Sequence, residues 1–127
     1  MVCSASRYGR SKMQVRPAAR QARKEVRRER IRIAEELAFR GFLLRRLISA
    51  DFESVSLRAF TAISFVVSSV AFGLLHGDRW LAGAVAGAVY AGVLLWRGRI
   101  GDAVVAHGVS NALIAVWVLA LGNWQLW

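Results

Sequence analysis

The 127-residue sequence has little of several things that common protein classes require. A single cysteine, Cys3, excludes an internal disulfide and with it a disulfide-stapled fold. Pro17 is the only proline, and it can stand at the start of a helix. The chain has 8 acidic residues against 18 Lys and Arg, and only two histidines. Its length permits one domain at most.

The positive charge is concentrated at the beginning of the chain. Of the formal net charge of +10, residues 1–34 hold 11 basic and two acidic residues (+9), which leaves +1 for the remainder. The charge does not coat the apolar part, so a basic nucleic-acid-binding domain is excluded as the first interpretation. We predict a basic head over residues 1–33, disordered to helical. Its arginines at helical spacing are either solvated or lie on anionic lipid headgroups.

Three long runs lack charged residues, namely Ala59 to Leu75, Trp80 to Trp96 and Ala103 to Leu121. A helix needs about 20 residues, with a range of about 17 to 25, to cross the hydrocarbon core. A soluble fold of this length cannot cover three such runs. We therefore predict an all-α, polytopic transmembrane bundle with about four helices in or at the membrane. Indole side chains favour the headgroup zone, and four of them lie at or beyond the ends of these runs: Trp80, Trp96, Trp124 and Trp127.

Two further patterns concern how these helices pack against each other and how they are oriented in the membrane. Gly83 and Gly87 are four residues apart, a spacing that lets membrane helices approach closely. Arginines cluster before the first run and between the second and third, which places the N-terminus in the cytoplasm by the positive-inside rule.

The few ionisable residues of the apolar part are candidates for a site. His76 ends the first run, and His107 lies inside the third with Asn111 one turn later. Glu35, Glu36 and Arg40 lie in the apolar helix predicted over residues 34–48. Ionisable groups inside a membrane usually face the bundle interior and are functional. The alternative is that each histidine only packs between helices and that Glu36 and Arg40 form an ordinary salt bridge of an interfacial helix.

Three ordered motifs carry a resemblance to a known family: E-E-x-x-x-R (Glu35-Glu36 to Arg40), F-x-x-x-H (Phe72 to His76) and H-x-x-x-N (His107 to Asn111). This set resembles that of the CAAX protease and bacteriocin-processing (CPBP or Abi) intramembrane endopeptidases. The phrases AFGLLHGDRWLAG and GRIGDAVVAHGVSNAL are similar to its bacterial CAAX prenyl protease-related branch, found with exosortase systems. The resemblance begins at about Ala34 and implies a hydrolase of the bacterial inner (plasma) membrane.

The resemblance also implies roles for these residues. The catalytic set is Glu35, Glu36, His76, His107 and Asn111, with Arg40 and Phe72 in support. Glu35 is the general base that activates water, and Glu36 with Arg40 holds the helix in place. Two mechanisms stay open: His76 and His107 could bind a metal such as zinc, or His107 and Asn111 could stabilise the oxyanion without one. The implied partners are the lipid bilayer and a peptide or protein substrate, with no specific nucleic acid.

The chain departs from the family in what precedes the E-E motif. Family members carry several transmembrane helices there, where this chain has the basic head. A truncated product, a mis-started reading frame and a half that requires a partner all fit this difference. Two other functions also stay open: a non-catalytic immunity or assembly factor of the same fold, and a membrane-tethered basic arm that binds anionic lipid or nucleic acid.

The proposed site conflicts with the simplest arrangement of the helices in the membrane. If each run crosses the bilayer once, His76 and His107 lie near opposite membrane surfaces, because a 17-residue helix is about 25 Å long. Convergence requires tilted or short helices around a polar interior. We predict that Glu35, His76 and His107 meet around one cavity.

Overall fold

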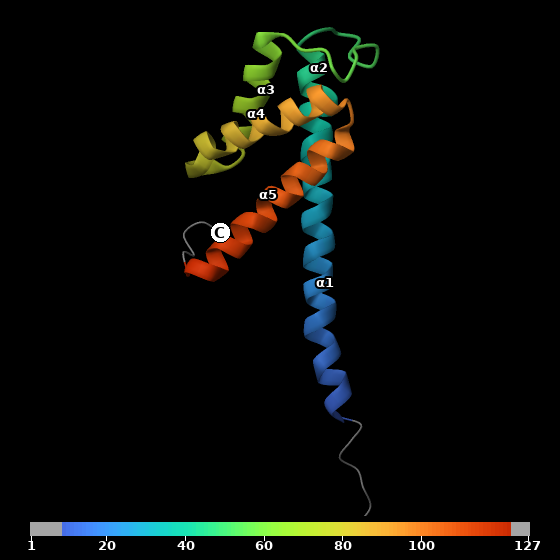
Figure 1. The fold of residues 1–127 in the computed structure, drawn as a ribbon. Helices are drawn as coiled ribbons and strands as arrows, with labels where there is room; N and C mark the ends of the chain where they lie inside the picture. Colours follow the sequence, from blue (N-terminus) through green and yellow to red (C-terminus); the bar gives the residue numbers. More distant parts are fainter. Residues whose placement is uncertain (1–8, 123–127) are drawn as a thin grey trace, which may run out of the picture. The chain divides into compact units, whose positions relative to one another are not determined.

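A computed structural model describes residues 9–122, and all regular secondary structure in that range is helical (Figure 1). The elements are α1 (Gly9–Glu36), the π-helix η1 (Leu37–Leu43), α2 (Leu44–Arg46), α3 (Ala62–Leu74), the 3₁₀ helix η2 (Gly77–Arg79), α4 (Trp80–Arg97) and α5 (Ile100–Leu121). The all-α prediction is confirmed. The predictions about Cys3, Trp124, Trp127 and the first eight residues of the head fall outside the described range.

The chain divides into two compact units, one ending at Ile31 and one beginning at Arg32. The first unit contains most of α1, which begins at Gly9. Pro17 therefore lies inside the helix, and the prediction that it stands at the helix start is wrong. Met13, Gln14 and Arg16, which precede it, are good helix formers and favour the helix on that side. From residue 19 to residue 31 every side chain of α1 is exposed. Contact of this stretch with lipid headgroups stays a prediction.

The helix α3 is shorter than the uncharged run that contains it. It has 13 residues, which corresponds to about 20 Å. Thr61 caps its start, because the Thr61 hydroxyl accepts from the Ser64 N–H while the Ser64 hydroxyl accepts from the Thr61 N–H. Since the hydrocarbon core is about 30 Å thick, the expectation that this run crosses a bilayer by itself is wrong. Two segments, Gly77–Arg97 and Ile100–Leu121, are long and apolar enough to cross.

Close backbone contact between α3 and α4 confirms the packing predicted from the glycine spacing. A Cβ added to Gly73 would lie 2.6 Å from the Ala84 nitrogen, and one added to Gly83 would lie 3.0 Å from the Gly73 Cα. The distance at Gly73 is too short for a real Cβ, so glycine is required there, and the distance at Gly83 is tight enough that α3 would have to shift slightly if Gly83 were replaced. Helix α4 also packs against α5, and it therefore forms the centre of the second unit.

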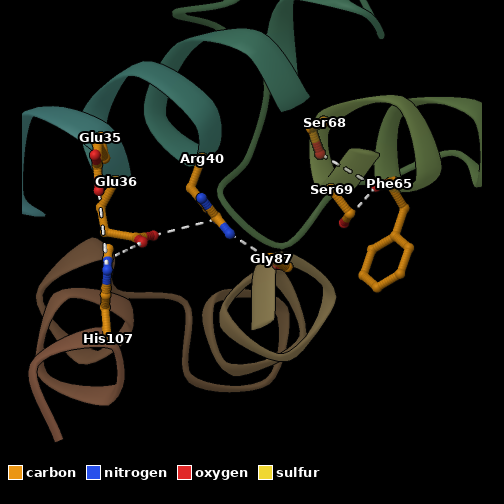
Figure 2. A network of polar contacts seen from close by, with 8 residues as sticks. All are labelled: Glu35, Glu36, Arg40, Phe65, Ser68, Ser69, Gly87 and His107. Atoms are coloured by element: carbon orange, nitrogen blue, oxygen red, sulfur yellow. Dashed lines mark hydrogen bonds and ion pairs between the residues drawn. The ribbon is translucent and has the colours of Figure 1, made fainter. Parts of the chain in front are cut away.

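The helix α3 places small serines on its packed face. Ser64, Ser68 and Ser69 are all buried, and their hydroxyls bond within their own helix. Ser68 and Ser69 both donate to the Phe65 carbonyl, at 3.2 and 2.7 Å (Figure 2). Because these polar groups are satisfied locally, they allow close packing without leaving a buried donor unpaired.

The loop between α2 and α3 is held by Arg45. Its guanidinium donates to the carbonyls of Val55 (2.8 Å), Glu53 (2.7 Å) and Gly41 (3.2 Å). Arg45 is one of the arginines before the first uncharged run, which predicted only the orientation in the membrane. Its hydrogen bonds also tie this loop to the end of η1.

The helix α5 leaves most of its apolar surface uncovered. Its buried residues are Ala103, His107 and Val118. Large apolar side chains along the rest of the helix, such as Leu113 and Leu119, are exposed. Such a surface suits a hydrocarbon environment. His107 is the one ionisable residue among the buried residues of α5.

Candidate active site

The π-helix η1 connects two residues of the E-E-x-x-x-R motif. Glu36 precedes η1 and Arg40 lies inside it. The helix is wider than an α-helix here, since the Leu44 N–H bonds to the Phe39 carbonyl five residues back. Single-turn π segments occur frequently at functional sites, because they re-aim side chains. Glu36 and Arg40 are the two charged side chains that this segment directs inward.

Glu36 and Arg40 form a fully buried ion pair. The Arg40 Nε lies 3.2 Å from Glu36 Oε2, and the two side chains are 1% and 0% exposed. The predicted pairing is confirmed, but an ordinary salt bridge of an interfacial helix would be partly solvated. Buried charges persist only where they are paired and supported by further polar contacts. Both partners of this pair therefore require further polar contacts.

Arg40 is supported from two directions. Its Nη2 donates to the Gly87 carbonyl of α4 at 2.8 Å (Figure 2). Its guanidinium carbon lies 4.2 Å from the centre of the Phe72 ring of α3, which is a cation–π contact. Burial lowers the pKa of the Arg40 guanidinium from its ordinary value, while the Glu36 carboxylate acts in the opposite direction. Arg40 thus joins η1 to both α3 and α4.

Glu36 also reaches the third motif. Its Oε1 lies 3.1 Å from Nδ1 of His107, which is 3% exposed. A carboxylate oxygen only accepts, so the proton of this bond belongs to His107 Nδ1. The bond fixes the tautomer and directs the other ring nitrogen, Nε2, away from Glu36. Glu36 therefore holds both Arg40 and His107, one with each oxygen.

Glu35 lies on the open side of the same histidine. Its Oε2 is 3.8 Å from His107 Nε2, and its side chain is 24% exposed where that of Glu36 is fully buried (Figure 2). The distance exceeds a direct hydrogen bond and suits a bridging water. Glu35 therefore lies close to His107, as the sequence predicted. Of the two carboxylates, only Glu35 is accessible to a reactant.

His76 reaches this cluster through Phe72. Its Nδ1 lies 3.0 Å from the Phe72 carbonyl, and the Phe72 ring contacts both the His76 ring (4.9 Å between centroids) and the His107 ring (5.6 Å). The Nδ1 contact leaves Nε2 of His76 available as an acceptor. Short α3 makes this convergence possible, since the two histidines no longer stand at opposite ends of spanning helices. No described contact joins His76 directly to Glu35.

Asn111 is the motif residue that the structure does not bring in. It is exposed, and its side chain makes no hydrogen bond or ion pair within residues 9–122. Within the same range, no three His, Cys, Asp or Glu side chains gather in positions that could hold a metal ion. The zinc site and the oxyanion role of Asn111 therefore stay predictions from the resemblance, and no step below depends on them.

Comparison with known proteins agrees with this geometry. The family model of the type II CAAX prenyl endopeptidase Rce1-like proteins matches residues 31–113. The chain belongs to this family. That range contains all three motifs and every residue of the cluster, and the family's description is that of an endopeptidase. The resemblance to CPBP endopeptidases is thereby confirmed, whereas the exosortase-associated branch stays a prediction. No curated protein and no solved structure matches the chain.

Sequence reasoning missed two parts of the site. Gly87 was recognised for packing, but its carbonyl as the acceptor for Arg40 was not foreseen. Tyr90, on the same face of α4 and 3% exposed, stacks on His107 and was not considered. A signal existed, because Tyr90 lies three residues after Gly87 and is a polar aromatic residue inside an uncharged run.

Proposed function

We propose that this protein is an intramembrane endopeptidase in which Glu35 activates a water molecule for attack on a peptide carbonyl. The observation that carries the proposal is the division of labour within the Glu35-Glu36 pair. Glu36 is fully buried and occupied by Arg40 and His107, whereas Glu35 is partly exposed beside His107 Nε2. A general base must reach both water and substrate, and only Glu35 is placed to do so.

The proposed chemistry uses the chain's own residues. A water molecule between Glu35 and His107 transfers a proton to the Glu35 carboxylate as its oxygen attacks the carbonyl carbon. The tetrahedral intermediate then collapses, the C–N bond breaks, and Glu35 returns the proton to the leaving amine. His107, oriented by Glu36, holds the water with Nε2. The remaining barrier is lowered by positioning, since the buried Glu36–Arg40 pair fixes the helix that carries Glu35.

The surroundings of the site favour an apolar substrate. The site lies among helices with exposed apolar surfaces, which favours a substrate that is apolar near the cleaved bond. A membrane-inserted C-terminal segment, such as the sorting signals handled alongside exosortases, has this character. The family's printed name, CAAX prenyl endopeptidase, adds the prenylated C-terminal peptide as a second probe.

The test is cleavage of two internally quenched peptides, one prenylated and one with an unmodified apolar C-terminus, by the full chain in proteoliposomes. We expect cleavage by the wild type, with one ¹⁸O from labelled water in the new carboxylate. Glu35→Gln should lower kcat by about 10²- to 10⁴-fold, because it removes the base but keeps the shape. Glu53→Gln, an exposed carboxylate in the loop after α2, is the matched control and should leave kcat unchanged.

Two outcomes would count against the proposal. Equal turnover by the wild type and Glu35→Gln would exclude Glu35 as the base. Absence of turnover by a correctly inserted wild type with both peptides would favour the alternative, a non-catalytic membrane protein of the same fold.

A further inference from the structure

Tyr90 is the buried polar aromatic residue of α4 that none of the three motifs includes. It belongs to the core formed with Phe72, Leu94 and Ala103. A hydroxyl is costly to bury inside an apolar helix, and an apolar residue would avoid that cost. The ring contacts of Tyr90 suggest what the residue contributes in return.

Tyr90 contacts α5 through its ring. The ring is stacked on the His107 imidazole, with 4.8 Å between centroids and 18° between planes. On its other neighbour, α3, it meets the Phe72 ring at 5.9 Å and 83°. One side chain of α4 thus contacts both helices that flank it.

The stack supplies a restraint that the hydrogen bond to Glu36 does not. A single bond at Nδ1 fixes one atom of His107 but leaves the ring free to turn about that point. The face of Tyr90 and the edge of Phe72, which meets His107 at 81° and 5.6 Å, together define the plane of the imidazole. The plane decides where Nε2 points, and therefore whether it faces Glu35.

We propose that Tyr90 is a positioning residue, which fixes the ring plane of His107 so that Nδ1 meets Glu36 and Nε2 faces Glu35. This inference rests on the proposed function. Small errors in the placement of reacting groups reduce rates strongly, which gives the restraint its value. Tyr90 touches neither water nor substrate in this account and acts through His107 alone.

The experiment combines NMR with kinetics on the full chain in detergent micelles, with isotope-labelled histidine. The chain has two histidines, so the His107 signals are assigned by comparison with His76→Gln. In the wild type we expect nuclear Overhauser contacts between Tyr90 and His107 ring protons, and ring-current shifts of the imidazole. In Tyr90→Leu the ring-current shifts should disappear, and kcat should fall between about twofold and tenfold with KM unchanged.

Two further variants separate positioning from general packing. Tyr90→Phe keeps the ring and loses only the hydroxyl, so the His107 signals and most of kcat should be retained. Trp96→Leu removes an aromatic ring from the same helix at a position that is 78% exposed, and it should change neither readout.

The proposal is overturned if the wild type shows no contact between the two rings, a measurement that needs no variant to fold. It is also overturned if Tyr90→Leu leaves the His107 signals and kcat unchanged, or if KM alone changes. Ring contacts that are present while the wild type cleaves neither peptide would support the placement of His107 and would contradict the proposed function instead.

Discussion

Two Glu–Arg pairs at helical spacing occur within sixteen residues of each other, and they lie in opposite surroundings. In α1, Arg28 and Glu25 are 3.9 Å apart with side chains that are 49% and 55% exposed. At the start of η1, Arg40 and Glu36 are 3.2 Å apart with side chains that are 1% and 0% exposed. The residue types are the same, and the spacings differ by one residue.

The difference between the two pairs shows that residue spacing predicts a contact but not its energetic contribution. Either spacing allows a contact along a helix, worth a few tenths of a kcal/mol when water surrounds it. Removing one partner of a buried pair costs about 3–5 kcal/mol, because the other charge is left without compensation. The surroundings, and not the pairing, turn the second pair into the framework of a site.

The largest change in the free energy of unfolding is expected from Arg40→Met, in the buried pair. The variant leaves the Glu36 carboxylate buried without its cation and removes the bond to Gly87, so we expect a loss of about 3–5 kcal/mol in the free energy of unfolding. Reversible unfolding in mixed micelles measures it. The double variant Glu36→Gln with Arg40→Met should recover part of the loss, because neither charge then remains. A loss below about 1 kcal/mol for Arg40→Met would mean that water reaches the pair.

A smaller effect is expected where α4 meets this pair. A Cβ at Gly87 would lie 3.0 Å from the Ser69 carbonyl oxygen and 3.1 Å from a Phe72 ring carbon. Gly87→Ala should therefore destabilise the protein by about 1–3 kcal/mol through overpacking, and it should displace the carbonyl that Arg40 uses.

Gly92→Ala is the matched control on the same helix. Nothing lies within 4 Å of a Cβ there, so this variant should be neutral or stabilising by up to about 1 kcal/mol through helix propensity. Thermal unfolding of the two variants side by side provides the measurement. Equal stability would show that α3 and α4 are not in close contact at Gly87.

The smallest effect is expected from Glu25→Gln in the exposed pair. Its partner is solvated, so the free energy of unfolding should change by less than about 0.5 kcal/mol. The same unfolding assay applies. A loss comparable with that of Arg40→Met would show that this part of α1 is covered in the folded protein, and the contrast between the two pairs would be lost.

Much of the site was predictable, because residue spacing along the helices and the rare ionisable residues indicate which side chains belong to it. Glu36 and Arg40 are four apart, so their pairing could be inferred from the sequence, and the motif set predicted that Glu35 lies near His107. The same prediction placed His76 beside Glu35, but no described contact joins these two residues. The length of α3 could not be predicted, because Thr61 and Ser64 start the helix inside an uncharged run that has no visible break. The internal role of Arg45 was also hidden, since charge counting treats a guanidinium bound to carbonyls like one in water.

The π-helix η1 makes the site depend on the number of residues as well as on their types. Each residue of an α-helix advances the chain by about 100° around the axis. A π segment takes up one extra residue by winding more slowly, so removing one residue between Leu37 and Leu43 would restore ordinary winding and leave Glu36 and Arg45 facing as before. The side chains inside the segment, Arg40 among them, would shift around the helix axis. The extra residue of η1 therefore adjusts how Arg40 is presented without changing the direction of the helices on either side.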